Sequence, residues 1–240
     1  MIRINIWSSP RNISTAMMYS FGNRPDTSVV DEPLYAHFLY HQQNRPAHPG
    51  EEEILQSQAN DGNEVVKSVL QADYPTPIVL FKQMTHHLLA IDWSFILAMK
   101  NILLIRNPAE IIQSYAKVIP NPSMEDVGIT KQKVLYDFLL NNGQQPVIID
   151  TNEVLKNPTK VLAELCHQLS IPFDTSMLQW EAGPRKEDGI WAPYWYQNVH
   201  RSTGFQPYEK KEIQLSDELM ALAQEAMPVY EFLYEKAIMG

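Results

Sequence analysis

The sequence predicts an α/β protein in which a central parallel sheet is flanked by helices. Apolar runs of strand length alternate with helical stretches, and this alternation requires crossover connections between parallel strands. Of the 240 residues, 45% are hydrophobic and 20% are charged, which is ordinary for a soluble globular protein. A chain of this length can bury one large core, so we expect a single domain over residues 1–240.

The predicted elements follow one another in a regular order. Residues 2–8 ("IRINIWS") place isoleucine at every second position and predict a strand, and a helix over 13–21 ends at Gly22-Asn23. The segment "TSVVDEP" predicts a short strand that ends at Pro33. Residues 181–208, rich in glycine, proline and aromatic residues, predict a long ordered loop of the kind that serves a site. Further strands are predicted over 76–82, 100–108 and 144–150, and helices over 51–72, 91–98, 108–118, 124–142, 158–170 and 216–237.

Charge and composition exclude several classes of partner. The net charge of −9 argues against nucleic acid, which usually requires a basic face, but a few arginines in one cleft are enough for a small anion. No apolar run approaches the roughly 18 residues that span a membrane, and the first residues lack a signal-peptide pattern. The single cysteine, Cys166, excludes an internal disulfide and predicts a buried thiol. We expect a cytoplasmic protein with no membrane partner; no pattern indicates its oligomeric state.

The first candidate anion site is "SSPRNIST" (8–15), where the first strand runs into a helix. The unpaired N–H groups of a helix start attract anions, and the helix dipole adds roughly half a positive charge. Arg11 adds a full charge, and Ser14 and Thr15 offer hydroxyl donors. The alternative is an ordinary turn in which the two hydroxyls only cap the helix.

The second candidate is "LLIRNPAEIIQSYAK" (103–117). Asn107, Pro108 and Glu110 indicate a capped helix start. Arg106 ends the preceding strand, and Ser114 lies two turns into the helix. A guanidinium beside a helix N-terminus is repelled by the dipole, and a bound anion would remove that conflict. The alternative is that Arg106 pairs with Glu110 or another carboxylate.

Together the two motifs resemble those of the PAPS-dependent sulfotransferase superfamily, including its bacterial members; PAPS is 3′-phosphoadenosine 5′-phosphosulfate. "PRNIST" is similar to the family's 5′-phosphosulfate loop, and "IRNPAEIIQSY" to its 3′-phosphate motif. "VIIDTNEVLKNPTKVLAELCHQLSIPF" and "PRKEDGIW" also resemble family segments, so the likeness spans about residues 4 to 195. The family has glycine where Ile13 stands, and its cytosolic members have tryptophan where Ala16 stands.

The resemblance implies a three-layer, P-loop NTPase-like fold, PAPS as sulfuryl donor, a small-molecule acceptor with a hydroxyl or amine, and no metal. The residues that it assigns to PAPS binding are Arg11, Asn12, Ser14, Thr15, Arg106, Ser114, Arg185 and Lys186.

Sulfuryl transfer also needs a base for the acceptor. "LFKQMTHHLL" (80–89) resembles a Lys-Thr-His triplet of cytosolic members, which makes Lys82, His86 and His87 catalytic candidates. Glu32-Pro33 resembles a Glu-Pro that ends the second strand in carbohydrate and bacterial members, so Glu32 is another candidate base. The alternatives are structural: a histidine at the surface or the edge of the core, and a glutamate paired with a lysine.

Two other functions remain open at this point. A P-loop-like kinase would use Asp31 as a magnesium ligand, although the G-x-x-x-x-G-K-[ST] loop is missing. A catalytically inactive nucleotide-binding protein of the same fold is favoured by Ile13 and Ala16.

Two further groups of side chains have both a structural and a functional interpretation. His37 and His41 have the i, i+4 spacing of metal ligands, but a polar helix face is the expected explanation. The aromatic residues of the loop either line an acceptor pocket or form a lid packed on the core: Trp191, Tyr194, Trp195 and Tyr196.

Overall fold

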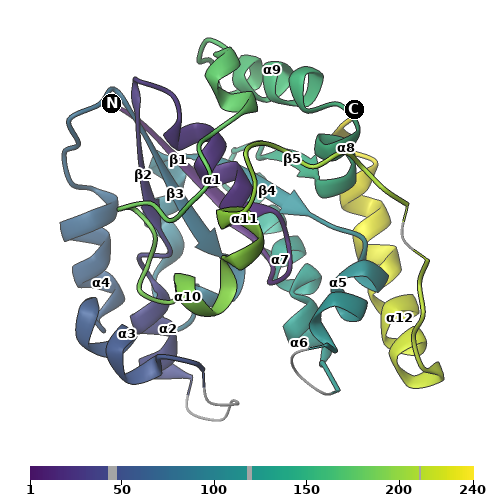
Figure 1. Cartoon of the computed structure of the whole chain (residues 1–240). Coiled ribbons are helices and arrows are strands. Elements are labelled where there is room, and N and C mark those ends of the chain that lie inside the picture. The colour runs from purple at the N-terminus through teal and green to yellow at the C-terminus, as the bar shows by residue number, and fades with distance from the viewer. Residues whose placement is uncertain (43–47, 118–120, 211) are drawn as a thin grey trace.

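The computed structural model describes residues 1–42, 48–117, 121–210 and 212–240, and its described part contains one six-stranded parallel sheet (Figure 1). The order across the sheet is β2-β3-β1-β4-β5-β6. The strands are β1 (Ile2–Ser8), β2 (Thr27–Asp31), β3 (Ile78–Met84), β4 (Lys100–Ile105), β5 (Val147–Asp150) and β6 (Ala237–Ile238). This order places β1 between β3 and β4, so the segments that follow these three strands open at neighbouring positions of one sheet edge.

Helices cover both faces of the sheet and bury its alternating side chains. On one face, Ile4 and Ile6 of β1 pack with residues of α1 (Ser14–Gly22) and α9 (Pro158–Gln168), and Cys166 is buried there as predicted. On the other face, Trp7 belongs to a cluster with residues of α5 (Pro108–Tyr115), α7 (Ile129–Asn141) and α12 (Asp217–Tyr234). Figure 1 shows α1 in front of the sheet and α12 along its right-hand side.

A smaller cluster lies beside the ends of β2 and β3. It joins α2 (Tyr35–His41), α3 (Glu51–Ser57) and α10 (Ala192–Trp195) through buried residues that include Phe38, Ile54 and Trp191. The predicted loop 181–208 contains α10 and α11 (Gln197–His200), and its aromatic residues pack against α2 and α3.

Two long predicted helices are broken. The 51–72 helix is divided into α3 and α4 (Gly62–Val65) because Asp61 caps a new helix start, and a single π-helical segment, Val66–Leu70, follows. The 124–142 helix is divided into α6 (Met124–Val127) and α7 at Gly128, which has φ +75°. A Cβ at Gly128 would lie 2.9 Å from the Cβ of Ser9, so this glycine also lets the helix junction approach the loop after β1.

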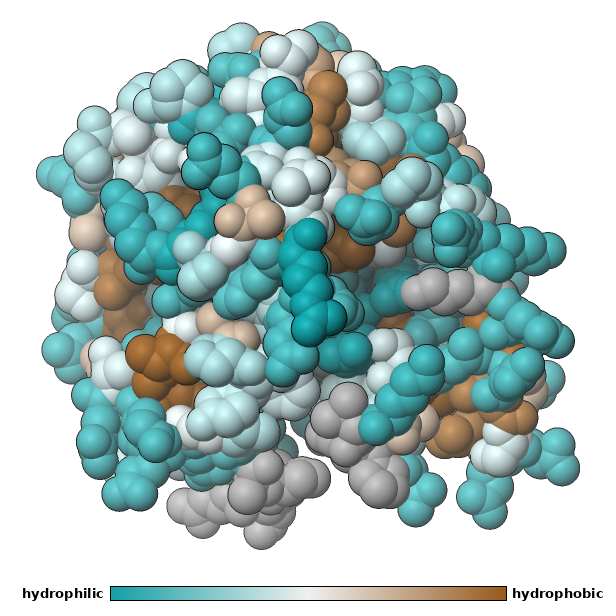
Figure 2. Space-filling model, in the orientation of Figure 1, coloured by the Kyte–Doolittle hydropathy of each residue, from teal (hydrophilic) through white to brown (hydrophobic). Residues whose placement is uncertain are grey.

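Other differences are at the ends of elements. Residues Trp93–Ala98 form a 3-10 helix instead of an α-helix, and α5 ends at Tyr115, while position 118 lies outside the described residues. α2, α8 (Thr151–Lys156) and β6 were not predicted as elements. Among the described residues, no helix is long and apolar enough to cross a membrane. Figure 2 shows that the face in view is mainly hydrophilic, with hydrophobic residues in separate patches.

Candidate active site

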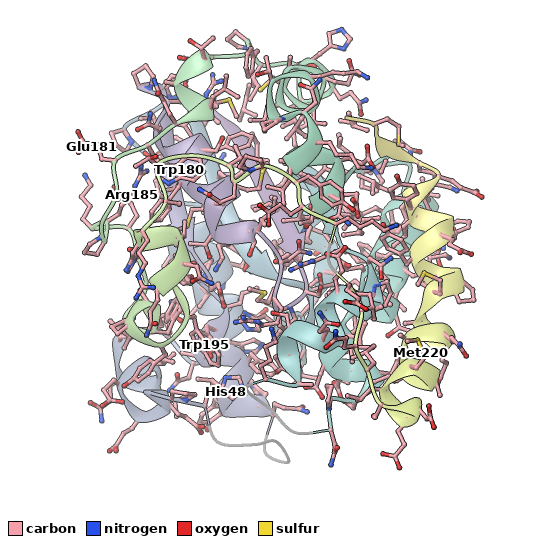
Figure 3. All side chains as sticks on the ribbon, turned by 45° about the vertical axis from the view of Figure 1, so that its right-hand side comes forward. His48, Trp180, Glu181, Arg185, Trp195 and Met220 are labelled. Atoms are coloured by element: carbon pink, nitrogen blue, oxygen red, sulfur yellow. The ribbon has the colours of Figure 1, made fainter. Side chains whose placement is uncertain are left out.

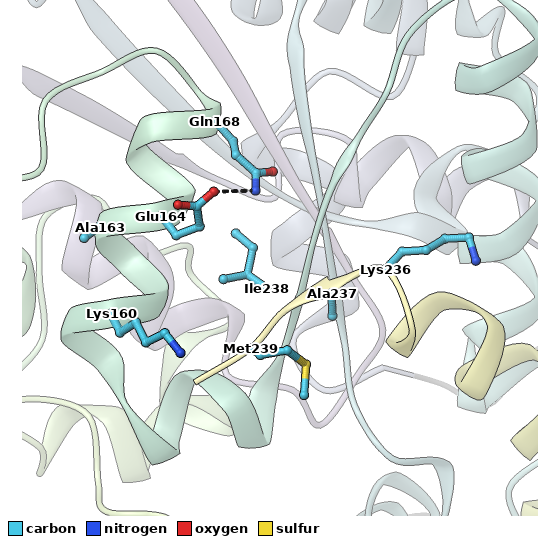
Figure 4. A pocket seen from close by; sticks show the side chains of 8 residues that line it. All are labelled: Lys160, Ala163, Glu164, Gln168, Lys236, Ala237, Ile238 and Met239. Carbon is cyan, nitrogen blue, oxygen red and sulfur yellow. Dashed lines mark hydrogen bonds between the residues drawn. The ribbon is translucent and has the colours of Figure 1, made fainter.

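A cleft of about 560 Å³ opens at the carboxyl ends of the central strands. Its walls come from the loop after β1 and the start of α1, from the segments after β2, β3 and β4, and from the 191–206 segment. A second hollow of about 580 Å³ lies between α9 and β6 (Figure 4), and there Glu164 and Gln168 hydrogen-bond to each other on α9. The side chains predicted to bind a ligand or to act in catalysis gather at the first of these two hollows and not at the second. The first hollow is therefore the candidate site.

The loop after β1 is fixed by Asn12. Its side-chain amide donates to the carbonyl of Leu104, 3.0 Å away, and its oxygen accepts hydrogen bonds from Thr151 Oγ1 and from the Ile13 amide. Asn12 thus ties the loop to β4 and α8. Its side chain is committed to the protein itself, which favours a structural role over direct contact with a ligand.

The start of α1 carries no side-chain cap. The N-cap residue is Ile13, so the alternative in which Ser14 and Thr15 cap the helix is wrong. Both residues line the cleft, and neither hydroxyl has a hydrogen-bond partner among the residues that the structure describes. The two hydroxyls and the first amides of α1 therefore remain available to an anion.

Arg11 and Arg106 come together from two strand ends. Arg11 Nε donates to Ser114 Oγ at 3.0 Å, and Arg106 Nη1 donates to the carbonyl of Arg11 at 2.6 Å. Arg106 also binds Glu110 through Nε and Nη2, at 3.0 and 2.9 Å, so the predicted alternative of an Arg106–Glu110 pair is confirmed.

Arg11, by contrast, has no carboxylate partner in the described ranges. Burial and the neighbouring charge of Arg106 lower the pKa of the Arg11 guanidinium. Two adjacent cations, of which only Arg106 is paired with a carboxylate, form a site that a bound anion would stabilise.

A buried ionic network lies on the other side of the cleft. Lys82 Nζ donates to Asp31 Oδ1 at 2.9 Å, to Tyr196 OH at 2.7 Å, and to Glu32 Oε1. The register of the sheet explains the first contact, because Asp31 of β2 lies directly beside Lys82 of β3. The alternative in which Glu32 pairs with a lysine is confirmed. All three ammonium protons of Lys82 are engaged, so its amino group is not free to bind a ligand.

Glu32 points its second oxygen toward His87. Glu32 Oε2 lies 3.9 Å from His87 Nε2, too far for a hydrogen bond, and both residues line the cleft. A small hydroxyl or amine between these two atoms would reach both. Burial raises the pKa of Glu32, and neighbouring Asp31 raises it further, whereas Lys82 opposes this rise.

Both histidines after β3 are neutral. Burial lowers the pKa of His86 to about 3 and also lowers the pKa of His87. His87 is stacked on Tyr35 and Phe38, with ring centroids 5.0 and 4.9 Å apart, and its Nδ1 is buried without a partner among the described residues. A bare ring nitrogen costs less to leave unpaired than an N–H group, so the proton belongs on Nε2, facing the cleft.

The structure does not bring Arg185 and Lys186 to the cleft. Arg185 packs on Tyr19 of α1, with its guanidinium carbon 4.2 Å from the ring centroid, and Lys186 is exposed beside Glu187. Figure 3 shows Arg185 near Trp180 and Glu181, apart from Trp195 and His48. The cleft is instead lined by Ser202, Gly204, Phe205 and Gln206, which belong to the loop predicted to serve a site but were not predicted individually as site residues.

The remaining sequence candidates are divided between the core and the wall of the cleft. His37 is buried, contrary to the expected polar helix face: its Nε2 lies 2.7 Å from the carbonyl of Leu89, and its Nδ1 accepts from the amide of Gly62. Within the described ranges, no group of three or more acidic, histidine or cysteine side chains is placed to hold a metal ion. Of the aromatic run, Trp191, Trp195 and Tyr196 line the cleft, while Tyr194 is half exposed.

Comparisons with known proteins agree with this geometry. A family model described as a sulfotransferase domain matches residues 2–237. The sulfotransferase domain of the Synechococcus PCC 7002 olefin synthase has a TM-score of 0.58 at 20% identity, covering 94% of both chains. A sulfotransferase from Alicyclobacillus acidocaldarius has a TM-score of 0.57 at 14% identity, covering 99% of this chain and 97% of that one. These likenesses and the parallel sheet confirm the predicted three-layer, P-loop NTPase-like fold.

Two longer relatives come from Arabidopsis thaliana. Branched-chain-amino-acid aminotransferase-like proteins 2 and 1 are each 38% identical to the chain over 231 residues, which make up 96% of this chain and 41% of each relative. The chain therefore spans about two fifths of the length of these relatives.

Proposed function

The chain belongs to the sulfotransferase domain family, and from this premise we propose that it transfers a sulfuryl group from PAPS to a hydroxyl or amine of a small acceptor. The observation that carries the proposal is the half-buried guanidinium of Arg11, which has no carboxylate partner in the described part of the chain and lies beside Arg106. Burying a cation without an anion is costly, so this arrangement is suited to a phosphate-bearing ligand.

The residues around Arg11 fit the phosphates of the donor. The uncapped start of α1, the hydroxyls of Ser14 and Thr15 and the free N–H groups of Arg11 offer donors on one side. Arg106 and Ser114 extend the donor set along the carboxyl end of β4. The donor, when bound, supplies the sulfuryl group, and these side chains would neutralise the charge that develops on the leaving phosphate.

The acceptor would bind between Glu32 and His87. Glu32 Oε2 accepts the proton of the acceptor hydroxyl or amine, and the Nε2–H of neutral His87 donates a hydrogen bond that orients it. A raised pKa makes the Glu32 carboxylate a better proton acceptor than an ordinary glutamate, whereas His86, with a pKa of about 3, is a poor base. We therefore assign the base to Glu32. Lys82, which also lines the cleft, holds Glu32 through a hydrogen bond.

The kinase alternative has little support. Both carboxylate oxygens of Asp31 are engaged, by Lys82 on one side and by Tyr196 and the Gly189 amide on the other, and the side chain is 1% exposed. Asp31 thus has no open position for a magnesium ion. An inactive nucleotide-binding protein of the same fold would bind the nucleotide without transferring sulfate, and the experiments below separate these outcomes.

Thermal stability measures donor binding. 3′-Phosphoadenosine 5′-phosphate at millimolar concentration is expected to raise Tm, and Arg11→Ala and Arg106→Ala are each expected to abolish the rise because each removes a phosphate-binding cation. Lys186→Ala is the matched control: it removes an exposed cation outside the cleft and leaves the ligand-induced rise intact. A folded wild-type protein without any rise in Tm contradicts the donor assignment.

Transfer of labelled sulfate from PAPS to a panel of phenols, alcohols and amines measures catalysis. Glu32→Gln is expected to lower kcat by about 10²- to 10⁴-fold, the usual contribution of a general base, while the Tm rise with nucleotide persists. His86→Ala is expected to have a much smaller effect on kcat, and transfer should survive EDTA. A Glu32→Gln variant with unchanged kcat would show that another group is the base.

A further inference from the structure

Tyr196 occupies a central position in the network around Lys82, although it comes from a segment far away in the sequence. Its hydroxyl donates to Asp31 Oδ2 at 2.7 Å and accepts from Lys82 Nζ, also at 2.7 Å. A third contact comes from the indole N–H of Trp191, 2.9 Å away. The hydroxyl is therefore saturated, and its position is fixed from three directions.

Asp31 is equally committed. Its two oxygens accept from Lys82 Nζ, from Tyr196 OH and from the backbone amide of Gly189, 3.0 Å away. Asp31 is absent from the residues that line the cleft, whereas Glu32 lines it and shares the same lysine. Asp31 therefore lies outside the cleft lining, while Lys82 and Tyr196 line the cleft beside Glu32 and connect it to Asp31.

The charges of this network do not cancel. Two carboxylates share one ammonium group, so Glu32 competes with Asp31 for Lys82. The titratable groups that face Glu32 are Asp31 of β2, Lys82 of β3, His87 after β3, and Tyr196 after α10. His86, His48 and Tyr35 lie around His87. Both histidines are neutral, so Lys82 and Asp31 are the groups that decide the charge around Glu32.

We propose that Asp31 and Tyr196 are positioning residues that divide Lys82 between two carboxylates and thereby set the pH at which Glu32 accepts a proton. This inference rests on the proposed role of Glu32 as the base. The Tyr196 hydroxyl donates a hydrogen bond to Asp31, so Asp31 depends less on Lys82. The Lys82 ammonium group can then stabilise the ionised form of Glu32 more strongly. The 189–196 segment supplies Gly189, Trp191 and Tyr196 to this network. It therefore helps to set the protonation of Glu32, in addition to lining the cleft.

The proposal predicts shifts of opposite sign from two nearly isosteric variants. Asp31→Asn removes a negative charge and leaves Lys82 to Glu32 alone, so the Glu32 titration should move to lower pH by about one unit. Tyr196→Phe deprives Asp31 of a donor, so Asp31 draws Lys82 toward itself and the Glu32 titration should move to higher pH by about one unit. Tyr230→Phe is the matched control, because it removes a hydroxyl from another buried aspartate, Asp150, outside the cleft.

Two readouts separate this inference from the proposed function. The first is the acid limb of kcat against pH for sulfate transfer. The second is the ¹³C NMR titration of carboxyl-labelled glutamates, with the Glu32 signal identified as the one lost in Glu32→Gln. If the wild-type protein transfers no sulfate, the proposed function fails, yet the NMR titration still decides whether Asp31 and Tyr196 control Glu32.

The expected result is a pair of opposite shifts with the control unchanged, in variants whose Tm shows that they are folded. Shifts in the same direction, or titrations that stay within about 0.2 pH units of the wild type, a difference worth under 0.3 kcal/mol, would overturn the proposal. Each variant decides by itself if the other does not fold.

Discussion

At the scale of single residues, the candidate site contains two side chains on strained backbone. Arg11 has φ +61° and Glu32 has φ +38°, the left-handed region that favours glycine. Such conformations cost of order 1–3 kcal/mol each and persist only when neighbours hold them. For Glu32, the amide donates to the Lys82 carbonyl at 2.9 Å, and its own carbonyl accepts from Tyr35 and Gln58. In the glycine-free loop after β1, Arg11 itself takes the left-handed position, so one residue provides both the turn and the charge.

This strain predicts how two substitutions at Arg11 differ. Arg11→Gly and Arg11→Ala both remove the guanidinium, so both should lose the rise in Tm with 3′-phosphoadenosine 5′-phosphate. Only glycine adopts the left-handed backbone at position 11 without strain. The free energy of unfolding, measured by urea titration, should therefore be about 1 kcal/mol higher for Arg11→Gly than for Arg11→Ala. An alanine variant as stable as the glycine variant would contradict the strain argument.

At the scale of elements, Asp150 links three of them. It ends β5, caps α8 through the amides of Asn152 and Glu153, at 2.8 and 3.2 Å, and accepts from Tyr230 of α12 at 3.0 Å. Burial raises the pKa of Asp150 to about 6 despite these hydrogen bonds. The carboxylate that orders this corner of the molecule is therefore costly to keep ionised.

The raised pKa of Asp150 determines how this residue changes the free energy of unfolding as the pH falls. As pH falls from 7 toward 4, the folded protein takes up a proton at about pH 6, before the unfolded chain does, so Asp150 alone makes the fold more stable. The gain is at most roughly 3 kcal/mol. Asp150→Asn keeps an acceptor for the cap and cannot titrate, so its unfolding free energy should lack this contribution between pH 6 and 4 in urea titrations. A wild-type minus variant difference that is constant with pH would contradict the assignment.

At the scale of the whole molecule, two adjacent arginines form a local positive site on an acidic protein. The net charge is −9, yet the carboxyl ends of β1 and β4 bring Arg11 and Arg106 together, with only Glu110 paired to either in the described part of the chain. Local charge dominates within a Debye length of about 8 Å at physiological salt. This distribution of charge therefore favours a small anion over an extended polyanion.

Ionic strength tests this separation of local from overall charge. The Kd of 3′-phosphoadenosine 5′-phosphate, measured by calorimetry, should rise as salt increases from 50 to 500 mM, because salt screens its attraction to the two arginines. A DNA duplex of about 20 base pairs should neither bind nor displace the nucleotide at physiological salt, because the surrounding surface repels it. Displacement by the duplex would mean that the basic surface is larger than these two residues.

The sequence by itself determined the elements and the strand ends that carry charge. Apolar runs, caps such as Asn107-Pro108 and the regular alternation of strands and helices are local signals, and they correctly placed β1, β3, β4, β5, α1, α5 and α9 to within a few residues. The sequence also placed Arg11 and Arg106 at strand ends, and parallel strands bring their carboxyl ends to one edge of the sheet. The bounds of each element and the place of each arginine at a strand end were predicted from residues within a few positions of one another in the sequence.

Only the tertiary structure decided which side chains share a partner. Asp31 meets Lys82 because β2 lies beside β3 in the sheet, and Tyr196 reaches both only after the 181–208 segment has folded back over them. In the folded segment, Arg185 packs on α1, and the cleft is lined by residues from 202–206 and not by Arg185. These contacts join residues far apart in sequence, and no local propensity encodes them, since they depend on strand order, register and the closure of a long loop.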